Sequence, residues 1–274
     1  MDTSDSDTHR QAGQTRAAMD FADADAAFER GDLAAAATAY EAAAAHYRSL
    51  EQPQPLAYCL HQLGVLRQYA GDYAGAEPLL QESLQLAEGL DDTAAMARSL
   101  HQLGRSRVQA GDYAGADDYY ERSLSLKTLL GDRPAMASTL HQMGMVRRLG
   151  GNLREAAEFY GLALAISQRL GDWTGVGGTL AELGRLRLQE GDLTAALANS
   201  WQALSIFHGT SRQEAAYAAI TILDVRRRMD AGEFAQAAGR AGITREVIAQ
   251  VEEAMQQGGN APVQGELPTA SPPL

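Results

Sequence analysis

Histidine recurs in this 274-residue sequence at a fixed interval, because His61, His101 and His141 stand 40 residues apart. Imidazole nitrogens can bind a metal ion, transfer protons or hydrogen-bond a ligand. Adjacent packed helices lie about 8 to 10 Å apart, whereas zinc needs each nitrogen within about 2.1 Å, so the three histidines are poorly placed to share an ion. No second metal ligand follows any of them at three or four residues. We therefore expect no metal site, and hydrogen bonding in a groove or packing within a repeat remain as their roles.

Other catalytic patterns are missing from the sequence. It has no phosphate-binding glycine loop and no Gly-x-Ser-x-Gly nucleophile elbow. Gly175-Val176-Gly177-Gly178 follows no predicted strand, so this glycine cluster favours close packing over phosphate binding. Cys59 is the only cysteine, and its neighbours Tyr58 and Leu60 predict a buried packing role. The sequence predicts a protein that is not an enzyme and uses no cofactor; an active site assembled from groove residues is the alternative.

The composition bounds the class of protein. The 35 acidic residues outnumber the 23 basic ones, giving a net charge of -12, so nucleic acid is an unlikely partner. Residues 1–16 hold no apolar secretion signal, and no later stretch is long and apolar enough to cross a membrane. A lone cysteine favours a reducing compartment. We expect a cytoplasmic protein.

A repeat of 40 residues organises the chain. The motif Leu60-His61-Gln62-Leu63-Gly64 returns at 100–104, 140–144 and, more loosely, 180–184. A second marker, Gly followed by Asp or Asn, keeps the same step at 31–32, 71–72, 111–112, 151–152 and 191–192. Apolar residues between the markers have helical spacing, glycine can end a helix, and aspartate can cap the next one. Each repeat is therefore predicted to be a pair of helices, for example 56–70 and 73–88.

The repeat resembles the tetratricopeptide repeat family in the forty-residue form found in bacterial signalling and scaffold proteins. The Leu-Gly pair, the Gly-Asp-Tyr turns at residues 71–73 and 111–113, and small residues such as Ala76 and Ala116 carry this resemblance. It implies an all-α fold, a right-handed α-solenoid of about six helix-turn-helix pairs with a C-terminal capping helix. The expected repeats are 14–50, 55–90, 93–130, 133–170, 173–208 and 211–240, followed by a cap at 243–257. Residues 1–13 and the Pro/Gly-rich tail 258–274 are predicted to be disordered.

The resemblance also implies that the first helix of each pair lines a concave groove. Projecting each first helix at about 100° per residue places His61 opposite the core. The same projection selects a set of candidate ligand contacts. They are Tyr58, His61, Tyr69, Arg98, His101, Arg105, His141, Met145, Arg148 and Arg185.

Charge separates between the two kinds of helix. Four predicted first helices, 56–70, 93–110, 134–149 and 174–190, carry eight arginines against two glutamates, or +6. Most acidic residues lie in the second helices and turns, which predicts a basic groove on an acidic body. Four of the arginines form a ladder on the side facing the second helix, where a structural role is favoured over a binding role. These are Arg67, Arg107, Arg147 and Arg187.

We therefore predict a noncatalytic protein-protein interaction scaffold that binds an extended, acidic peptide or protein segment in a basic groove. The alternative is a regulatory peptide sensor whose superhelix changes shape on ligand binding and signals to an effector. The expected partner is a protein or peptide, with no membrane contact. Self-association through Trp173, Trp201 or Phe207 is left open.

Overall fold

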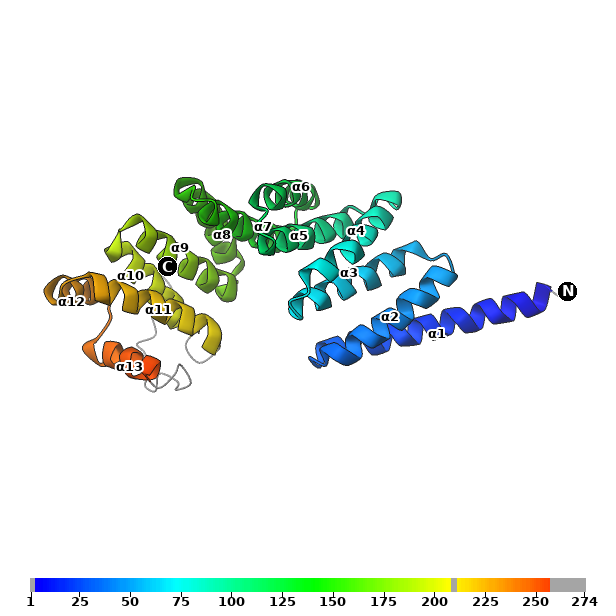
Figure 1. Ribbon diagram of the computed structural model, residues 1–274, viewed down its shortest axis with the longest axis horizontal. Helices are drawn as coiled ribbons and strands as arrows, with labels where there is room; N and C mark the ends of the chain where they lie inside the picture. The colour runs from blue at the N-terminus through cyan, green and yellow to red at the C-terminus, as the bar shows by residue number, and fades with distance from the viewer. Residues whose placement is uncertain (1–2, 208–210, 257–274) are drawn as a thin grey trace. The chain divides into compact units, whose positions relative to one another are not determined.

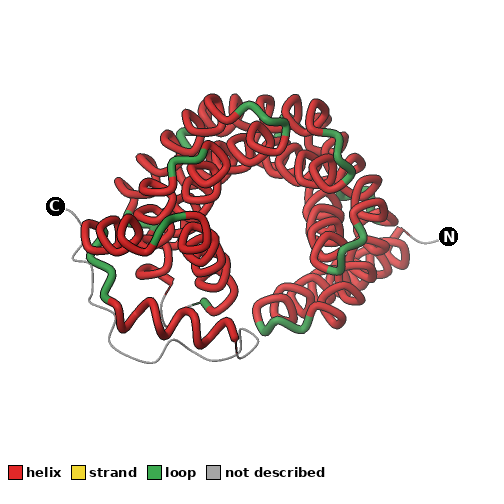
Figure 2. The backbone as a smooth tube through the Cα atoms, turned by 60° about the vertical axis from the view of Figure 1, so that its left-hand side comes forward, coloured by secondary structure: helices red, strands yellow, loops and turns green. Residues whose placement is uncertain are grey.

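The computed structural model describes residues 3–207 and 211–256, and this part of the chain folds into thirteen α-helices with no strand (Figures 1 and 2). Consecutive helices form six pairs followed by one last helix. The pairs are α1 (Thr3–Glu29) with α2 (Leu33–Ser49), α3 (Pro53–Tyr69) with α4 (Tyr73–Gly89), α5 (Thr93–Gln109) with α6 (Tyr113–Leu130), α7 (Arg133–Leu149) with α8 (Leu153–Leu170), α9 (Trp173–Glu190) with α10 (Leu193–Phe207), and α11 (Arg212–Arg228) with α12 (Ala231–Arg240); α13 is Arg245–Gln256. The predicted all-α fold of stacked helix pairs is confirmed.

The turns inside the pairs follow from the Gly-Asp marker. Gly71 adopts a φ of 79°, a left-handed conformation that favours glycine and ends α3. Asp72 then caps α4, because its Oδ1 accepts a 2.8 Å hydrogen bond from the backbone N–H of Gly75. Asp112 caps α6 in the same way, at 2.9 Å from the N–H of Gly115. One dipeptide therefore stops one helix and starts the next.

The chain divides into two compact units, Met1–Asp132 and Arg133–Leu274. In the N-terminal unit α1 to α6 pack in chain order, and the first helices α3 and α5 also contact each other. In the C-terminal unit the first helices α7 and α9 make the corresponding contact. A first helix is thus covered both by its own second helix and by the first helix of a neighbouring pair.

Close packing within each pair explains the glycine of the Leu-Gly motif. A Cβ placed on Gly104 would lie 2.6 Å from Cε1 of Tyr120, and a Cβ on Gly144 would lie 2.6 Å from Cδ1 of Tyr160. Both tyrosines are fully buried on the second helix of the pair. The motif therefore marks the point where a tyrosine ring lies directly on the first helix.

The N-terminal boundary differs from the sequence prediction. Helix α1 begins at Thr3, whereas residues 1–13 were expected to be disordered. Helix extension adds one hydrogen bond per ordered residue once a turn exists, and residues such as Ala17, Ala24 and Ala27 anchor the later turns in the core. At the other end, Ile243 and Val247 pack into the core of the C-terminal unit. The tail predicted to be disordered, 258–274, lies outside the described residues.

Lysine is the rarest charged residue of the chain. Lys127, near the end of α6, is the only lysine beside 22 arginines. Its side chain is buried, and burial lowers the pKa of its ammonium group to about 8.

Candidate functional site

Two first helices of the N-terminal unit carry six of the predicted groove residues. Helix α3 holds Tyr58, His61 and Tyr69, and helix α5 holds Arg98, His101 and Arg105. Their exposures differ widely. Tyr69 is 61% exposed and Arg98 is exposed, Tyr58 and Arg105 are half-buried, and both histidines are buried.

The buried histidines correct the projection that placed His61 opposite the core. His61 and His101 are each 9% exposed, and His141 is half-buried. A projection treats a helix as an isolated cylinder, but each of these faces lies against a neighbouring helix. The ring of His101 lies 5.4 Å from that of Tyr120, and the ring of His141 lies 5.6 Å from that of Tyr160. The histidines pack between helices, so they are not a free row of side chains in a groove.

Burial also fixes the charge of these side chains. Removal from water and, to a smaller extent, the nearby guanidinium of Arg98 together lower the pKa of His61 to about 4. Burial holds the pKa of His101 well below its usual value, with Lys127 and Arg105 contributing. Both imidazoles are therefore neutral at pH 7 and can donate or accept a hydrogen bond without charge.

The predicted groove arginines of the C-terminal unit are already paired. Glu182 of α9 lies 3.2 Å from Arg148 and 3.2 Å from Arg185. It also accepts a 3.4 Å hydrogen bond from the hydroxyl of Tyr160. Glu182 stands at the repeat position that Gln62, Gln102 and Gln142 hold in the other pairs. This single carboxylate is shared by two arginines, so it offsets one of their two positive charges; Met145 of the same unit is half-buried.

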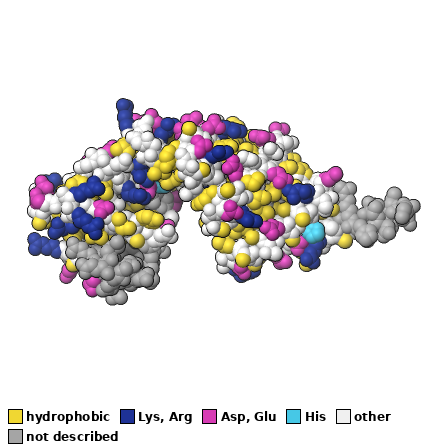
Figure 3. Space-filling view, viewed as in Figure 1, with side chains coloured by type: hydrophobic (Ala, Val, Ile, Leu, Met, Phe, Trp, Pro, Cys, Tyr) yellow, Lys and Arg dark blue, Asp and Glu magenta, His cyan; other side chains and the backbone are white. Residues whose placement is uncertain are grey.

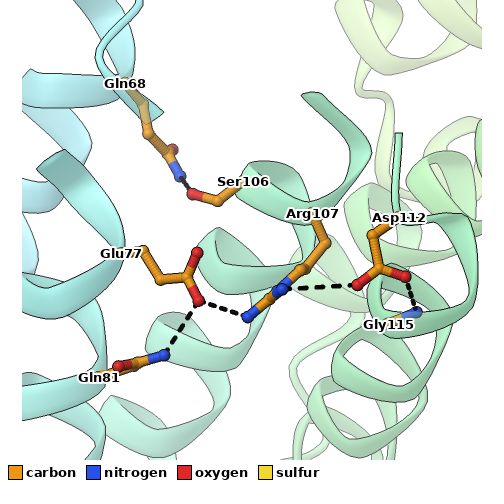
Figure 4. Close-up of polar contacts among 7 residues, drawn as sticks. All are labelled: Gln68, Glu77, Gln81, Ser106, Arg107, Asp112 and Gly115. Carbon is orange, nitrogen blue, oxygen red and sulfur yellow. Dashed lines mark hydrogen bonds and ion pairs between the residues drawn. The ribbon is translucent and has the colours of Figure 1, made fainter. Parts of the chain in front are cut away.

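The arginine ladder fastens helices together, as Figure 4 shows for Arg107. Its guanidinium pairs with Glu77 of α4 and lies 3.5 Å from Asp112, the residue that caps α6. Gln81 donates a 3.1 Å hydrogen bond to the same Glu77. Arg67 pairs with Asp72, the cap of α4, at 3.3 Å, and Arg147 pairs with Glu155 of α8 at 3.2 Å, whereas Arg187 pairs within α9 itself, with Glu190 at 2.6 Å. These contacts support the structural role.

Six of the eight first-helix arginines are thus paired with carboxylates, which leaves Arg98 and Arg105. Neither has a carboxylate partner among the described side chains, and Arg105 only donates a 3.1 Å hydrogen bond to Gln102. The sum of +6 counted first helices alone and missed the pairing with second helices and turns. Over the face drawn in Figure 3, basic and acidic side chains are intermixed. The first-helix arginines without any carboxylate partner among the described residues therefore lie on α5, while Arg148 and Arg185 share one carboxylate.

Gln68 connects the same two helices. Its side-chain amide donates to the backbone oxygen of Gln102 at 2.8 Å. It also donates to the hydroxyl of Ser106 at 2.9 Å (Figure 4). The side chain is 3% exposed. This buried bridge fixes α3 against α5 and so sets the distance between Tyr58, on one helix, and Arg98, on the other.

A pocket of about 110 Å³ opens between α3, α4 and α5. Three predicted residues, Tyr58, His61 and Arg98, line it. The sequence analysis missed the other lining residues, which are Gln54, Ala57, Ser83, Asp92, Ala95 and Ser99. Most are small, and Asp92 belongs to the capping pattern, so the type of residue alone gave no signal. For Ser99 the repeat register did give a signal, because Ser99 stands where Thr139 and Thr179 stand in later pairs.

In residues 3–207 and 211–256, no group of three or more His, Cys, Asp or Glu side chains is arranged so that it could hold a metal ion. Within the same ranges, no helix combines the length and the apolar character that a bilayer span requires.

Comparison with known proteins places the repeats in context. The family model described as Tetratricopeptide repeat matches residues 56–128, 95–169 and 135–208, together more than half of the chain. A search of curated proteins finds no match to the sequence. Many solved structures share the fold.

Three of these structures show how far the likeness extends. BtubC (BKLC) from P. vanneervenii has a TM-score of 0.61 and 21% identity, over 96% of this chain and 97% of that one. The apo form of RapI has a TM-score of 0.69 and 16% identity, over 88% and 91%. A Rap protein complexed with Competence and Sporulation Factor has a TM-score of 0.64 and 12% identity, over 89% and 71%. At these identities the likeness concerns the fold.

Proposed function

Because this chain belongs to the tetratricopeptide repeat family, we propose that it is a noncatalytic interaction scaffold that binds an extended, acidic segment of a partner protein on α3 and α5. The observation that carries this proposal is the pair of arginines on α5 without carboxylate partners. Stacked helix pairs present long surfaces for extended ligands. The proposal also rests on the Rap structure in complex with a Phr* peptide, which shares this fold with a TM-score of 0.63.

The spacing of Arg98 and Arg105 suits such a ligand. Seven residues of α-helix separate them by about 10 Å along the axis and return to the same face. A ligand in the extended polyproline II conformation advances about 3.1 Å per residue and returns to the same face every three residues, so acidic side chains about three residues apart reach both guanidinium groups. Arginine pairs with carboxylates in a bidentate geometry that lysine lacks.

The remaining predicted contacts take different parts in the proposal. Tyr58 and the exposed ring of Tyr69 supply contact area along α3. The buried His61 and His101 position the helices beneath the ligand, and the half-buried His141 packs against Tyr160 in the C-terminal unit. In the C-terminal unit, Arg148 and Arg185 both pair with Glu182, so the proposal gives them and the half-buried Met145 no part in the α3–α5 surface.

A peptide selection tests the proposal and does not require the partner to be identified. Displayed random peptides are selected on the purified protein, and the selected sequences are measured by fluorescence anisotropy. We expect enrichment of peptides with acidic residues. Reversal of both arginines, Arg98→Glu with Arg105→Glu, should weaken binding by about 100-fold or more, since each charged hydrogen bond contributes about 1.5 kcal/mol or more.

The matched control reverses two exposed arginines of α8, Arg154→Glu with Arg169→Glu, and should leave the affinity within about twofold. Circular dichroism checks that both double variants keep their helicity. Selected peptides without acidic residues, or equal weakening by both double variants, would contradict the proposal.

A regulatory peptide sensor is the second candidate, favoured by the division of the chain into two units at Asp132. In this function a bound peptide changes the shape of the molecule and an effector detects the change. Small-angle scattering with and without a selected peptide separates the two candidates. A change in the radius of gyration on binding favours the sensor, and superimposable curves favour the scaffold.

A further inference from the structure

The pocket between α3 and α5 holds a histidine whose hydrogen bonding is incomplete. His61 lines the pocket, is about nine-tenths buried, and its Nδ1 has no hydrogen-bond partner among the described residues. A buried polar atom without a partner is destabilising, so such an atom beside a pocket points to a ligand.

The C-terminal unit shows how this position is satisfied elsewhere. Nδ1 of His141 lies 3.1 Å from the hydroxyl of Thr179, which connects α7 to α9. Ser99 stands at the matching place for His61, but its hydroxyl lies 3.1 Å from the hydroxyl of Ser83. Because the single hydroxyl hydrogen of Ser83 goes to the carbonyl of Ala57, Ser99 must be the donor to Ser83. The hydroxyl of Ser99 therefore donates to Ser83 and not to His61. Serine also lacks the methyl group that threonine has at this position in later pairs.

Two opposite charges also line the pocket without pairing with each other. Asp92, the cap of α5, and Arg98, on α5, stand six residues apart, about 9 Å along the helix axis, and form no ion pair with each other among the described residues. Asp92 caps the helix through Oδ1, which accepts from the N–H of Ala95 at 2.9 Å. Its second oxygen is in no hydrogen bond among the described residues. A purely anionic ligand would meet the carboxylate of Asp92, and a purely cationic one would meet Arg98.

We propose that this pocket binds a free α-amino acid, whose ammonium group pairs with Asp92 and whose carboxylate binds Arg98 and the Nδ1–H of His61. The zwitterion satisfies both charges and the unpartnered histidine nitrogen at once. Ala57, Ala95 and the ring of Tyr58 form apolar walls, so the ligand carries a small, uncharged side chain. This site goes beyond the proposed function, although Arg98 belongs to both, so a bound amino acid competes with an acidic partner for that arginine.

Nuclear magnetic resonance on the full chain with ¹³C,¹⁵N-labelled histidine tests the site in the absence of any partner. L-Alanine is titrated in, and the His61 imidazole signals, assigned from a His61→Gln spectrum, report binding. A ligand of about six non-hydrogen atoms can reach a dissociation constant of about 1 mM within ordinary efficiency limits. We expect a saturable shift of the His61 signals at such concentrations.

Two derivatives identify the source of the ligand. N-Acetyl-L-alanine lacks the ammonium group and resembles the end residue of a chain, and L-alaninamide lacks the carboxylate and resembles the first residue of a chain. Each should bind at least about tenfold more weakly than L-alanine, because one charged contact is lost. If either derivative bound as tightly as L-alanine, the natural ligand would be a peptide end and not a free amino acid, and the proposal would be overturned.

Conservative variants locate the binding. Arg98→Gln should weaken L-alanine at least about tenfold, whereas Arg105→Gln, which changes the other unpaired arginine outside the pocket, should leave it unchanged. Asp92→Asn should also weaken it while keeping the cap, since Asn152 caps α8 in the same way. Ser99→Thr should abolish binding by giving His61 the partner that His141 has.

Circular dichroism confirms that each variant folds, and threonine is already present at this register in later pairs. A lack of any saturable His61 shift in the wild type, or an undiminished shift in Arg98→Gln, would overturn the proposal. These outcomes are independent of the peptide selection, so the amino acid site and the scaffold function can fail separately.

Discussion

The glycine of each Leu-Gly motif is the residue on which the pairing of helices depends most directly. Gly104 leaves room for the ring of Tyr120, and an added Cβ would lie 2.6 Å from it. The sequence predicted a repeat from this glycine, but the reason became visible only with the tyrosine opposite. Likewise, the sequence named His61 and Arg98 as contacts, whereas the burial of the imidazole depends on helices 40 residues away. Single-helix geometry cannot contain that information.

The substitution Gly104→Ala should destabilise the protein by about 1 to 3 kcal/mol, because the new methyl group overpacks a fully buried tyrosine. Gly161→Ala is the matched control in α8, since no atom lies within 4 Å of a Cβ placed there. This control should stabilise the protein by about 0.5 to 1 kcal/mol through helix propensity. Urea unfolding followed by circular dichroism measures both changes, and effects of the same sign would contradict the packing account.

Stability should fall as the pH drops from about 6.5 toward 4. In this window the unfolded chain protonates its histidines, with an ordinary pKa of about 6.5, while folded His61 stays neutral with a pKa of about 4. The unfolded state then binds more protons, so the free energy of unfolding rises with pH across this window. His61 alone should account for about 3 kcal/mol, at about 1.4 kcal/mol per pKa unit.

Urea unfolding at a series of pH values provides the measurement, and a His61→Gln variant should flatten the slope between pH 6.5 and 5. The groups facing His61 include Arg98 on α5, which stays charged throughout this window. An unchanged slope in the variant would show that other groups control the pH dependence.

Contacts between neighbouring first helices distinguish the two units at the scale of elements. Gln68 connects α3 to α5 through two hydrogen bonds, whereas Arg148, at the same repeat position, connects α7 to α9 through Glu182. The helices and their caps could be predicted from the sequence, because Gly-Asp turns and apolar spacing act locally. Which arginines stay unpaired could not be predicted, since their partners come from other helices. As a result, the arginines of the predicted groove that have no carboxylate partner are confined to α5.

Replacement of the central carboxylate, Glu182→Gln, should destabilise the C-terminal unit by about 1 to 3 kcal/mol. The side chain of Arg148 is only 12% exposed and would lose its charged partner. Glu190→Gln breaks the more exposed pair with Arg187 and should change stability by less than about 1 kcal/mol. Thermal unfolding of both variants, read at the same pH and salt, compares them; equal destabilisation would remove the distinction between these two pairs.

At the scale of the whole molecule, the repeat count was readable from the sequence, while the division into two units was not. The boundary follows Asp132, yet Gly131-Asp132 has the same form as Gly171-Asp172 inside the C-terminal unit. Both glycines adopt the left-handed conformation, with φ of 67° at Gly131 and 69° at Gly171. The difference arises from the sum of packing contacts on either side, which no short motif encodes.

The single lysine makes proteolysis a direct measure of how often α6 opens. Endoproteinase Lys-C cuts after lysine, so its one cleavage site follows Lys127, inside α6 and with its side chain buried. Cleavage requires that the last turns of α6 open, because a protease needs an extended, accessible chain. Increasing urea should accelerate this single cut into fragments 1–127 and 128–274. The rate of that cut follows the opening of the chain a few residues from the boundary between its two units.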